Sequence, residues 1–432
     1  AARHPTQRHS PMSFNALLRR GSSLKFGRPY STASGKPDNL YSLVEASVSS
    51  NPWKDALLFK RKEGSGYHWD YQTLHWQLDG LAEGLKQARL TPNNVFACNE
   101  PTGPPHVMAF LATGVLGMQF SPVSTKKRMN DLKADLLKVQ PQGILFPSTF
   151  HEDFHEIIPE SKNMYIDQFY RSVDFPKLRT TLSSGGVPHK AFIPLNAILC
   201  PETPFAKKTF DAAKSRPSSH ILLTIPASDE HVYNFSHGSV VSSSHAARDF
   251  LKLKPEDRML IALPFTLSPS TYAATVLSTL SAGACLVLPE DAGDACGVLE
   301  RAQTTCASVL AVDAATWESV CAHAANFNLE KLETVLVVST PQVQLSKPIQ
   351  LPASMSHCKV LRAFATEQSA GLLFHTSADA SPATLGNPFP GVEVKSDSSG
   401  LLLKGAMLPA EAADWLPSRV RATKSEAGYT MA

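Results

Sequence analysis

The sequence predicts an α/β protein with two lobes built on mostly parallel sheets, followed by a small β region. Short apolar runs alternate with helical patterns of about ten residues, and this alternation indicates βαβ units. The chain of 432 residues is long enough for more than one hydrophobic core. Its 32 prolines and 23 glycines favour many connections over a few long helices.

The first 30 residues have the composition of a mitochondrial transit peptide. They are rich in Ser, carry six Arg and Lys residues, and no Asp or Glu precedes Asp38. The segment RPYS at 28–31 resembles the pattern that the matrix peptidase cleaves. Because the chain begins with Ala, Met12 is a candidate for the true start; a disordered basic tail is the alternative interpretation. We therefore expect a mitochondrial protein, in the matrix or on the matrix side of the inner membrane.

The charge and the cysteine usage limit which kinds of partner and which cellular compartment the sequence favours. The net charge is +3, but without the six leader cations 35 basic residues face 38 acidic ones, which leaves the body slightly acidic at −3. This balance argues against nucleic acid as a direct partner. The seven cysteines form no CxxC pair, which favours buried thiols in a reducing compartment. No apolar run is long enough for a membrane span, so any membrane association is peripheral.

The first lobe is predicted over residues 38–150. Leucines at 74, 78, 81 and 85 indicate a helix with one apolar face, and GILF at 143–146 is a short buried strand. The predicted order is helix 40–48, strand 55–62, helix 73–90, strand 94–98, helix 106–116, a strand around 120, helix 131–139 and strand 143–146.

Residues 151–215 contain Pro and little periodicity, which predicts an irregular connection between the lobes. The second lobe is predicted over 216–385. Its strands are predicted at 221–224, 259–263, 285–288, 308–312, 334–339 and 360–365, with helices at 238–251, 270–281, 295–304 and 314–325. The short segments VEVK and LLLKG, separated by Gly, predict a β-barrel-like region over 386–432.

Six segments in register carry a resemblance to one family. They are the segments at 67–97, 251–265, 277–289, 364–371, 385–395 and 414–429. Their order and composition resemble the large N-terminal domain of the adenylate-forming superfamily, which includes acyl-CoA synthetases, luciferases and AMP-binding peptide synthetases. The resemblance implies two stacked αβαβα lobes with central, mostly parallel sheets and a small C-terminal β-barrel. The family's mobile C-terminal domain, with its catalytic Lys, would lie beyond Ala432.

Enzymes of this family activate a carboxylate with ATP, and a Gly-rich loop ending in Lys holds the phosphates. Glycines allow the backbone N–H groups to face the phosphates, and Lys adds charge. Here TIPASDEHVY at 224–233 stands in that position, with neither Gly nor Lys. Pro226 removes a donor, and Asp229 and Glu230 add negative charge. By this resemblance Thr224 and His237 are vestiges of the cofactor site.

Some other positions of the family's site are replaced in this sequence, and others are retained. Ala363 and Phe364 stand for the family's adenine-stacking Tyr and the Gly after it, and Val420 stands for the Asp that binds the ribose. Thr366 and Glu367 match residues that in the family contact the α-phosphate and Mg²⁺. One carboxylate alone is a poor Mg²⁺ site. We therefore predict no catalytic residue, no metal and no cofactor, with Thr366 and Glu367 as further vestiges; ATP and Mg²⁺ are implied only if the chain is an active ligase.

Three further signals have ordinary interpretations. HEDFH at 151–155 matches the HExxH pattern of zinc hydrolases, but flanking prolines leave it about two helical turns and no third ligand follows. His245 lies eight residues after His237 on one predicted helix, where a structural role is expected for His237. The serines at 242–244 are expected on the surface of that helix.

The main hypothesis is a catalytically inactive acyl-CoA-synthetase-like protein that acts as an accessory or scaffold subunit of a mitochondrial assembly. A respiratory complex, ATP synthase and the ribosome are the candidate assemblies. One alternative is a divergent acyl- or aryl-acid CoA ligase that forms an acyl-adenylate. Another is a module that binds an acyl chain or an acyl carrier.

Overall fold

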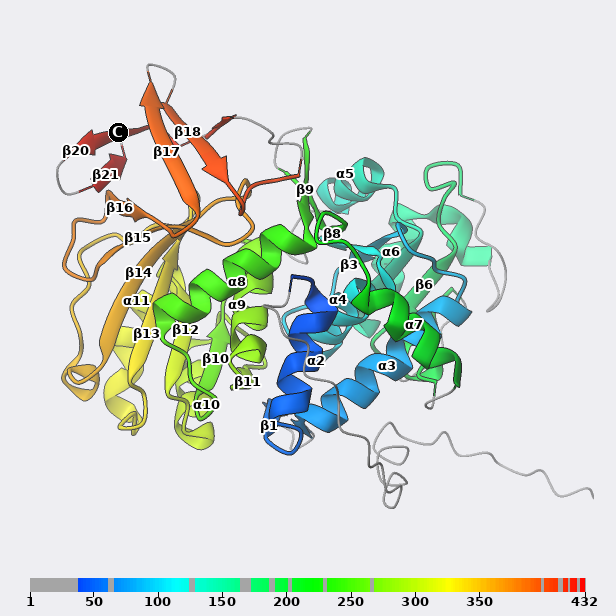
Figure 1. The fold of residues 1–432 in the computed structure, drawn as a ribbon, viewed down its shortest axis with the longest axis horizontal. Helices are drawn as coiled ribbons and strands as arrows, with labels where there is room; N and C mark the ends of the chain where they lie inside the picture. Colours follow the sequence, from blue (N-terminus) through cyan, green and yellow to red (C-terminus); the bar gives the residue numbers. More distant parts are fainter. Residues whose placement is uncertain are drawn as a thin grey trace, which may run out of the picture.

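The computed structural model describes most of the chain after the leader. The described residues are 38–60, 66–123, 129–163, 172–185, 191–200, 204–227, 231–264, 268–397, 400–410, 415–418, 420–425 and 428–431. The predicted transit peptide over residues 1–30 lies outside them. The structure has two α/β lobes side by side and a small antiparallel sheet at one end (Figure 1).

The first lobe is built on a seven-stranded sheet in the order β7-β6-β5-β3-β4-β8-β9. All neighbours are parallel except β8 and β9, which form an antiparallel hairpin. The central strand β5 is buried along its whole length, which explains its continuous apolar sequence. The strands are β3 (Val95–Cys98), β4 (Gln119–Pro122), β5 (Gly143–Phe146), β6 (Thr180–Ser183), β7 (Ile193–Pro194), β8 (Ile221–Pro226) and β9 (Val232–Ser236).

The second lobe is built on an eleven-stranded sheet in the order β2-β1-β11-β10-β12-β13-β14-β15-β16-β21-β20. The run from β1 to β14 is parallel, and the strands outside that run are antiparallel. The strands are β1 (Asp55–Lys60), β2 (Gly66–Asp70), β10 (Arg258–Ala262), β11 (Cys285–Leu288), β12 (Val309–Asp313), β13 (Thr334–Ser339), β14 (Lys359–Ala365), β15 (Leu372–Ser377), β16 (Thr384–Pro388), β20 (Ala422–Ser425) and β21 (Gly428–Met431).

Helices cover both sheets, and α8 and α9 lie between the two lobes (Figure 1). Several helices begin at side-chain caps; for example, Ser236 accepts the Ser239 amide at the start of α8. They are α2 (Leu40–Ser50), α3 (Tyr71–Gln87), α4 (Pro104–Leu116), α5 (Met129–Val139), α6 (His151–Ile157), α7 (Pro204–Lys214), α8 (His237–Leu251), α9 (Pro269–Ser281), α10 (Ala295–Thr305) and α11 (Ala314–His323). Short 3₁₀ turns are η1 (Ser148–Phe150), η2 (Pro159–Asn163), η3 (Leu195–Ala197), η4 (Ala324–Asn326) and η5 (Ala353–Met355).

The predicted lobe boundaries are wrong at two places, because the sheets exchange strands across them. Strands β1 and β2 join the second lobe's sheet, and β8 and β9 join the first lobe's sheet. The stretch 151–215 is not wholly irregular, because it contains α6, α7, β6 and β7. The strand β6 has the sequence TTLS and is buried along its whole length. Because three of its four residues carry hydroxyl groups, the sequence does not predict this burial. The serines 243 and 244 are also buried, between α8 and neighbouring elements, rather than on the surface.

The predicted C-terminal barrel is replaced by two open sheets. Strands β17 (Val392–Asp397), β18 (Gly400–Gly405) and β19 (Leu416–Pro417) form a separate three-stranded sheet, and no closed barrel occurs among the described residues. Strands β16, β21 and β20 instead extend the large sheet. The apolar alternation of these short strands predicts that one face is buried, but not which sheet each strand joins.

The structure bears on two expectations drawn from the composition, which concern membrane spans and the state of the cysteines. Within the described residues, no helix has the length and apolar character that a membrane span requires. All seven cysteines are free thiols. Cys98, Cys285 and Cys358 are buried as expected, whereas Cys296 and Cys306 are exposed.

Candidate functional site

The hairpin of β8 and β9 occupies the place where the resemblance puts the phosphate loop. Thr224 pairs with Asn234, and Pro226 pairs with Val232. One step further, the Ala227 N–H donates to the His231 carbonyl at 3.0 Å. The pairing of the two strands therefore extends to Ala227 and His231, and the three residues between them, 228–230, lie outside the described residues. A phosphate loop needs several successive N–H groups turned toward one point, and paired extended strands do not provide them.

Thr224 lies on the inner part of this hairpin and is only 4% exposed. Its hydroxyl group lies 2.9 Å from Gln119 Oε1 and 3.0 Å from Asn234 Oδ1, and it donates to these acceptors. Both partners are side chains of neighbouring strands, β4 and β9. In this arrangement the Thr224 hydroxyl connects three strands of the first lobe's sheet.

His237 is the first residue of α8 and is buried. Its Nδ1 accepts the Leu40 N–H at 3.2 Å, which satisfies the first amide of α2. Burial, with smaller contributions from Arg216 and His220, lowers the pKa of His237 to about 3. The ring is therefore neutral near pH 7, and its bond joins two helices far apart in the sequence.

Thr366 and Glu367 lie in the turn between β14 and β15. Thr366 is buried, and its Oγ1 accepts the Gln368 N–H at 3.3 Å. The next side chain, Gln368, was missed by the sequence analysis. Its amide group donates to the Pro417 carbonyl at 2.9 Å and lies 3.3 Å from the Tyr233 hydroxyl. The turn is thus tied both to the β8–β9 hairpin and to the small C-terminal sheet.

The positions that the resemblance assigns to nucleoside contacts are Ala363, Phe364 and Val420. Ala363 and Phe364 are both buried within β14, and Phe364 lies next to the Phe374 ring of β15 at 6.5 Å between centroids. A side chain enclosed in this way presents no face on which an adenine could stack. Val420 is buried as well, and it carries no oxygen for a ribose hydroxyl.

The HExxH-like segment forms the short helix α6, although the side chains of residues 151–153 lie outside the described ones. His155 is buried, and its Nδ1 lies 2.6 Å from the Ser161 hydroxyl. In the part of the chain that the structure describes, no group of three His, Cys, Asp or Glu residues is placed to hold a metal ion.

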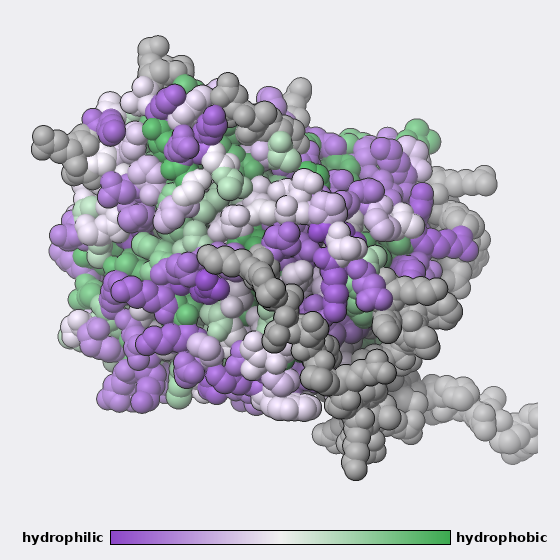
Figure 2. Space-filling view, in the orientation of Figure 1, coloured by the Kyte–Doolittle hydropathy of each residue, from purple (hydrophilic) through white to green (hydrophobic). Residues whose placement is uncertain are grey.

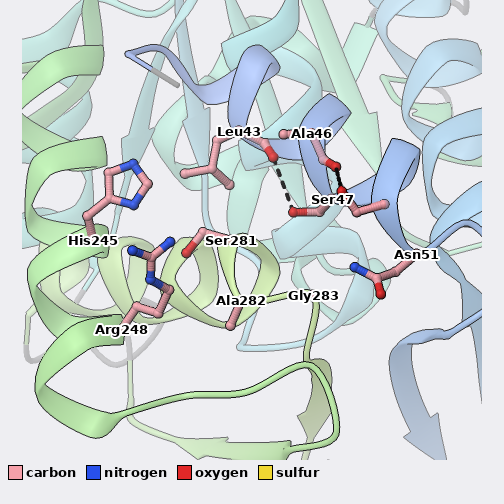
Figure 3. A pocket seen from close by; sticks show the side chains of 10 residues that line it. Leu43, Ala46, Ser47, Asn51, His245, Arg248, Ser281, Ala282 and Gly283 are labelled. Carbon is pink, nitrogen blue, oxygen red and sulfur yellow. Dashed lines mark hydrogen bonds between the residues drawn. The ribbon is translucent and has the colours of Figure 1, made fainter. Parts of the chain in front are cut away.

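A cavity of about 270 Å³ lies between α2, α8 and α9, away from these motif residues (Figure 3). His245 and Arg248 of α8 line one side, and the Arg248 guanidinium bonds to Asp249 at 2.9 and 3.0 Å. The hydroxyls of Ser50 and Ser281 line the cavity too, and each donates to a carbonyl of its own helix at 2.9 Å. Because these polar groups already have protein partners, the lining does not indicate one class of ligand.

The described residues thus form a two-lobed α/β protein with helices between the lobes and a small sheet beside the turn that holds Thr366. No protein-family model matches the sequence, and no curated protein matches it. Solved structures do match. An anthranilate CoA ligase, AuaEII, in complex with anthranoyl-AMP is 14% identical, with 91% of this chain and 77% of that chain covered and a TM-score of 0.72.

Two further structures give the same result. The amide bond synthetase McbA from Marinactinospora thermotolerans is 16% identical, with 91% and 78% covered and a TM-score of 0.70. The N-terminal domain of FACL13 from Mycobacterium tuberculosis is 13% identical, with 91% and 99% covered and a TM-score of 0.69. The chain therefore has the fold of the large N-terminal domain of adenylate-forming enzymes, and the predicted resemblance is confirmed at the level of fold.

Proposed function

We propose that this chain is a non-catalytic protein with the adenylate-forming fold, which serves as an accessory or scaffold subunit of a mitochondrial multiprotein assembly. The observation that carries the proposal is the β8–β9 hairpin, whose pairing continues to the Ala227–His231 bond. This pairing uses the backbone that a phosphate loop would turn toward ATP. Fold alone does not imply activity, so the loss of this loop weighs more than the likeness of the fold.

The charges of the turn support the same proposal. Asp229 and Glu230 lie between Ala227 and His231 in the sequence, and no Lys or Arg lies between Thr224 and His237. Two like charges about 5 Å apart repel by roughly 1 kcal/mol in water and several kcal/mol at an effective dielectric near 20. A polyphosphate placed beside this turn would meet that repulsion, and the hairpin itself supplies no Lys or Arg to offset it; the neighbouring Lys138 Nζ already donates to the Ala227 carbonyl at 2.9 Å.

The surface provides apolar contacts that a partner subunit could cover. Figure 2 shows hydrophobic residues interspersed with hydrophilic ones over one face of the molecule. Within the described residues the large apolar side chains that are exposed include Trp53 at 75% and Val173 at 89%. Exposed Trp side chains are enriched at protein interfaces. The mitochondrial location rests on the predicted leader.

A divergent acyl- or aryl-acid CoA ligase is the second candidate, and the comparisons favour it more than the scaffold role. One similar structure is named as a CoA ligase and holds an acyl-adenylate, and another is named as an amide bond synthetase. Thr366 and Glu367 are also present where the family's residues contact the α-phosphate and Mg²⁺. In this candidate, a turn of different shape would have to replace the phosphate loop.

Calorimetry with ATP and Mg²⁺, and separately with AMP, distinguishes the candidates. A non-catalytic protein gives no heat of binding with either nucleotide, and it migrates in native gels of mitochondrial extracts with a larger assembly. A micromolar Kd for ATP–Mg²⁺, or migration only as a free monomer, would overturn the first candidate. Pyrophosphate exchange that depends on an added fatty or aryl acid, and that Glu367→Gln abolishes, would establish the second.

A further inference from the structure

The side chain of Arg362 carries a buried positive charge in the middle of β14. It is only 4% exposed. Its Nη1 donates to the Ala380 carbonyl at 2.6 Å and to the Ser381 carbonyl at 3.3 Å, and its Nη2 donates to the Pro382 carbonyl at 3.3 Å. These carbonyl oxygens are neutral, so they satisfy N–H groups without balancing the charge. A buried charge is normally paired, because an unpaired one costs several kcal/mol.

No carboxylate supplies that balance in the described part of the chain. Burial is the cause that lowers the pKa of Arg362, with no acidic neighbour opposing it. Asp379, which directly precedes the Ala380 that accepts from Arg362, is exposed and bonds to Ser377. Arg remains protonated at any physiological pH, so deprotonation does not relieve the cost.

A small cavity of about 10 Å³ is lined by Arg362 together with Ser339, Thr376 and Thr384. Among the described residues the Nε of Arg362 has no hydrogen-bond partner, although it is buried. About 10–15 Å³ is the space that one water-sized particle needs. The cavity therefore joins an unsatisfied cationic donor and hydroxyl groups at a space too small for any polyatomic anion.

We propose that this cavity binds one chloride ion, which accepts from Arg362 Nε and balances its charge. The walls come from the end of β13, from β14, β15 and β21, and from β16 with the turn before it, so the bound ion stabilises the junction of the second lobe with its antiparallel extension. The inference is independent of the proposed function, since it involves neither the hairpin nor a nucleotide. A water in the same place would satisfy Nε but leave the charge unbalanced.

Unfolding midpoints measured in sodium chloride and in sodium gluconate at equal ionic strength test the proposal. For one site on the folded state only, each tenfold rise of chloride above its Kd raises the folded-to-unfolded ratio tenfold. Arg362→Gln should abolish the difference between the two salts. Arg216→Gln is the matched control, because Arg216 also donates to backbone carbonyls, of Gly114 and Val115, yet does not line this cavity. It should lower stability and keep the chloride response.

Chloride-35 NMR tests the wild-type protein directly, even where Arg362→Gln fails to fold. Excess broadening of the chloride line that bromide reverses is expected for the wild type, and Thr384→Val should weaken it. The proposal is overturned if the wild type gives no excess broadening and equal midpoints in both salts, which would mean that the cavity holds water only. Equal chloride responses of Arg362→Gln and the wild type would overturn it as well.

Discussion

Acidification should destabilise this fold through two buried histidines, His106 and His237. Both rings are at most 1% exposed. Burial lowers the pKa of His106 to about 4 and that of His237 to about 3, against about 6.5 in the unfolded chain. Because the folded pKa lies below the unfolded one, each ring contributes stability above pH 6.5. That stability is lost as the pH falls from 6.5 toward 4, where the unfolded chain binds protons that the folded chain does not.

The size of the effect follows from these pKa values. At pH 5 each histidine of the unfolded chain is almost fully protonated and each folded one almost fully neutral, which costs about 2 kcal/mol per ring relative to pH 7. The two rings together lower the free energy of unfolding by about 4 kcal/mol, a large part of the usual 5–15 kcal/mol. His75 is buried as well, and burial together with Lys214 lowers its pKa to about 4, so it adds a further loss of similar size.

Urea unfolding at pH 7, 6 and 5 measures this loss. The variant His237→Gln keeps an acceptor for the Leu40 N–H but cannot titrate. It should be less stable than the wild type at pH 7, yet lose about 2 kcal/mol less between pH 7 and pH 5. His323→Gln is the matched control, because it removes a histidine that is exposed on α11 instead of a buried one. If His237→Gln loses as much stability as the wild type, buried neutral histidines are not the cause.

Two further substitutions test the packing and the site. Gly84→Ala should lower the free energy of unfolding by more than about 3 kcal/mol or abolish folding, because the added Cβ would overlap the Ile198 carbonyl oxygen. Gly103→Ala is the control: the nearest atoms to its added Cβ would lie at 3.8 Å, so the melting temperature should change little. Gln368→Ala should lower the free energy of unfolding by roughly 1–3 kcal/mol, because it removes the bonds to Tyr233 and Pro417; an unchanged urea midpoint would show that this tie contributes nothing.

Strands buried on both faces could be predicted closely, because an apolar run leaves little choice. Cys285–Leu288 and Thr334–Ser339 each contain such a run, and β11 and β13 have these same bounds, whereas β10 and β12 are each displaced by one residue from the prediction. The strand β6 was missed because three of its four residues have hydroxyl groups. Thr180 donates to the Ala88 carbonyl at 2.8 Å, and Thr181 donates to the Ala191 carbonyl. These partners become available only in the folded chain, so no local pattern indicates that the segment is buried.

The sequence marks candidate site residues through the resemblance, but it does not specify the contacts that these residues make. The resemblance marks Thr366 and Glu367, whereas Gln368 carries the bonds that join the turn to the rest of the site. Its partners, Tyr233 and Pro417, are 135 and 49 residues away in the sequence. Contacts between segments so far apart depend on how the two lobes and the small sheet pack together, which composition and spacing do not specify.

Residues that match the family's motifs need not take part in the family's chemistry, because two of them, His237 and Thr224, connect elements of the fold. His237 joins α8 to α2, and Thr224 joins β8 to Gln119 of β4 and Asn234 of β9. Thr224→Val should therefore lower the free energy of unfolding by about 1–3 kcal/mol, since it leaves buried acceptors without their donor. In the scaffold candidate this loss of stability is the whole effect, and the assembly still forms at temperatures where the variant is folded. In the ligase candidate the same variant also loses the acid-dependent pyrophosphate exchange of the wild type. A wild type without exchange activity, together with a variant that is only less stable, supports the scaffold candidate.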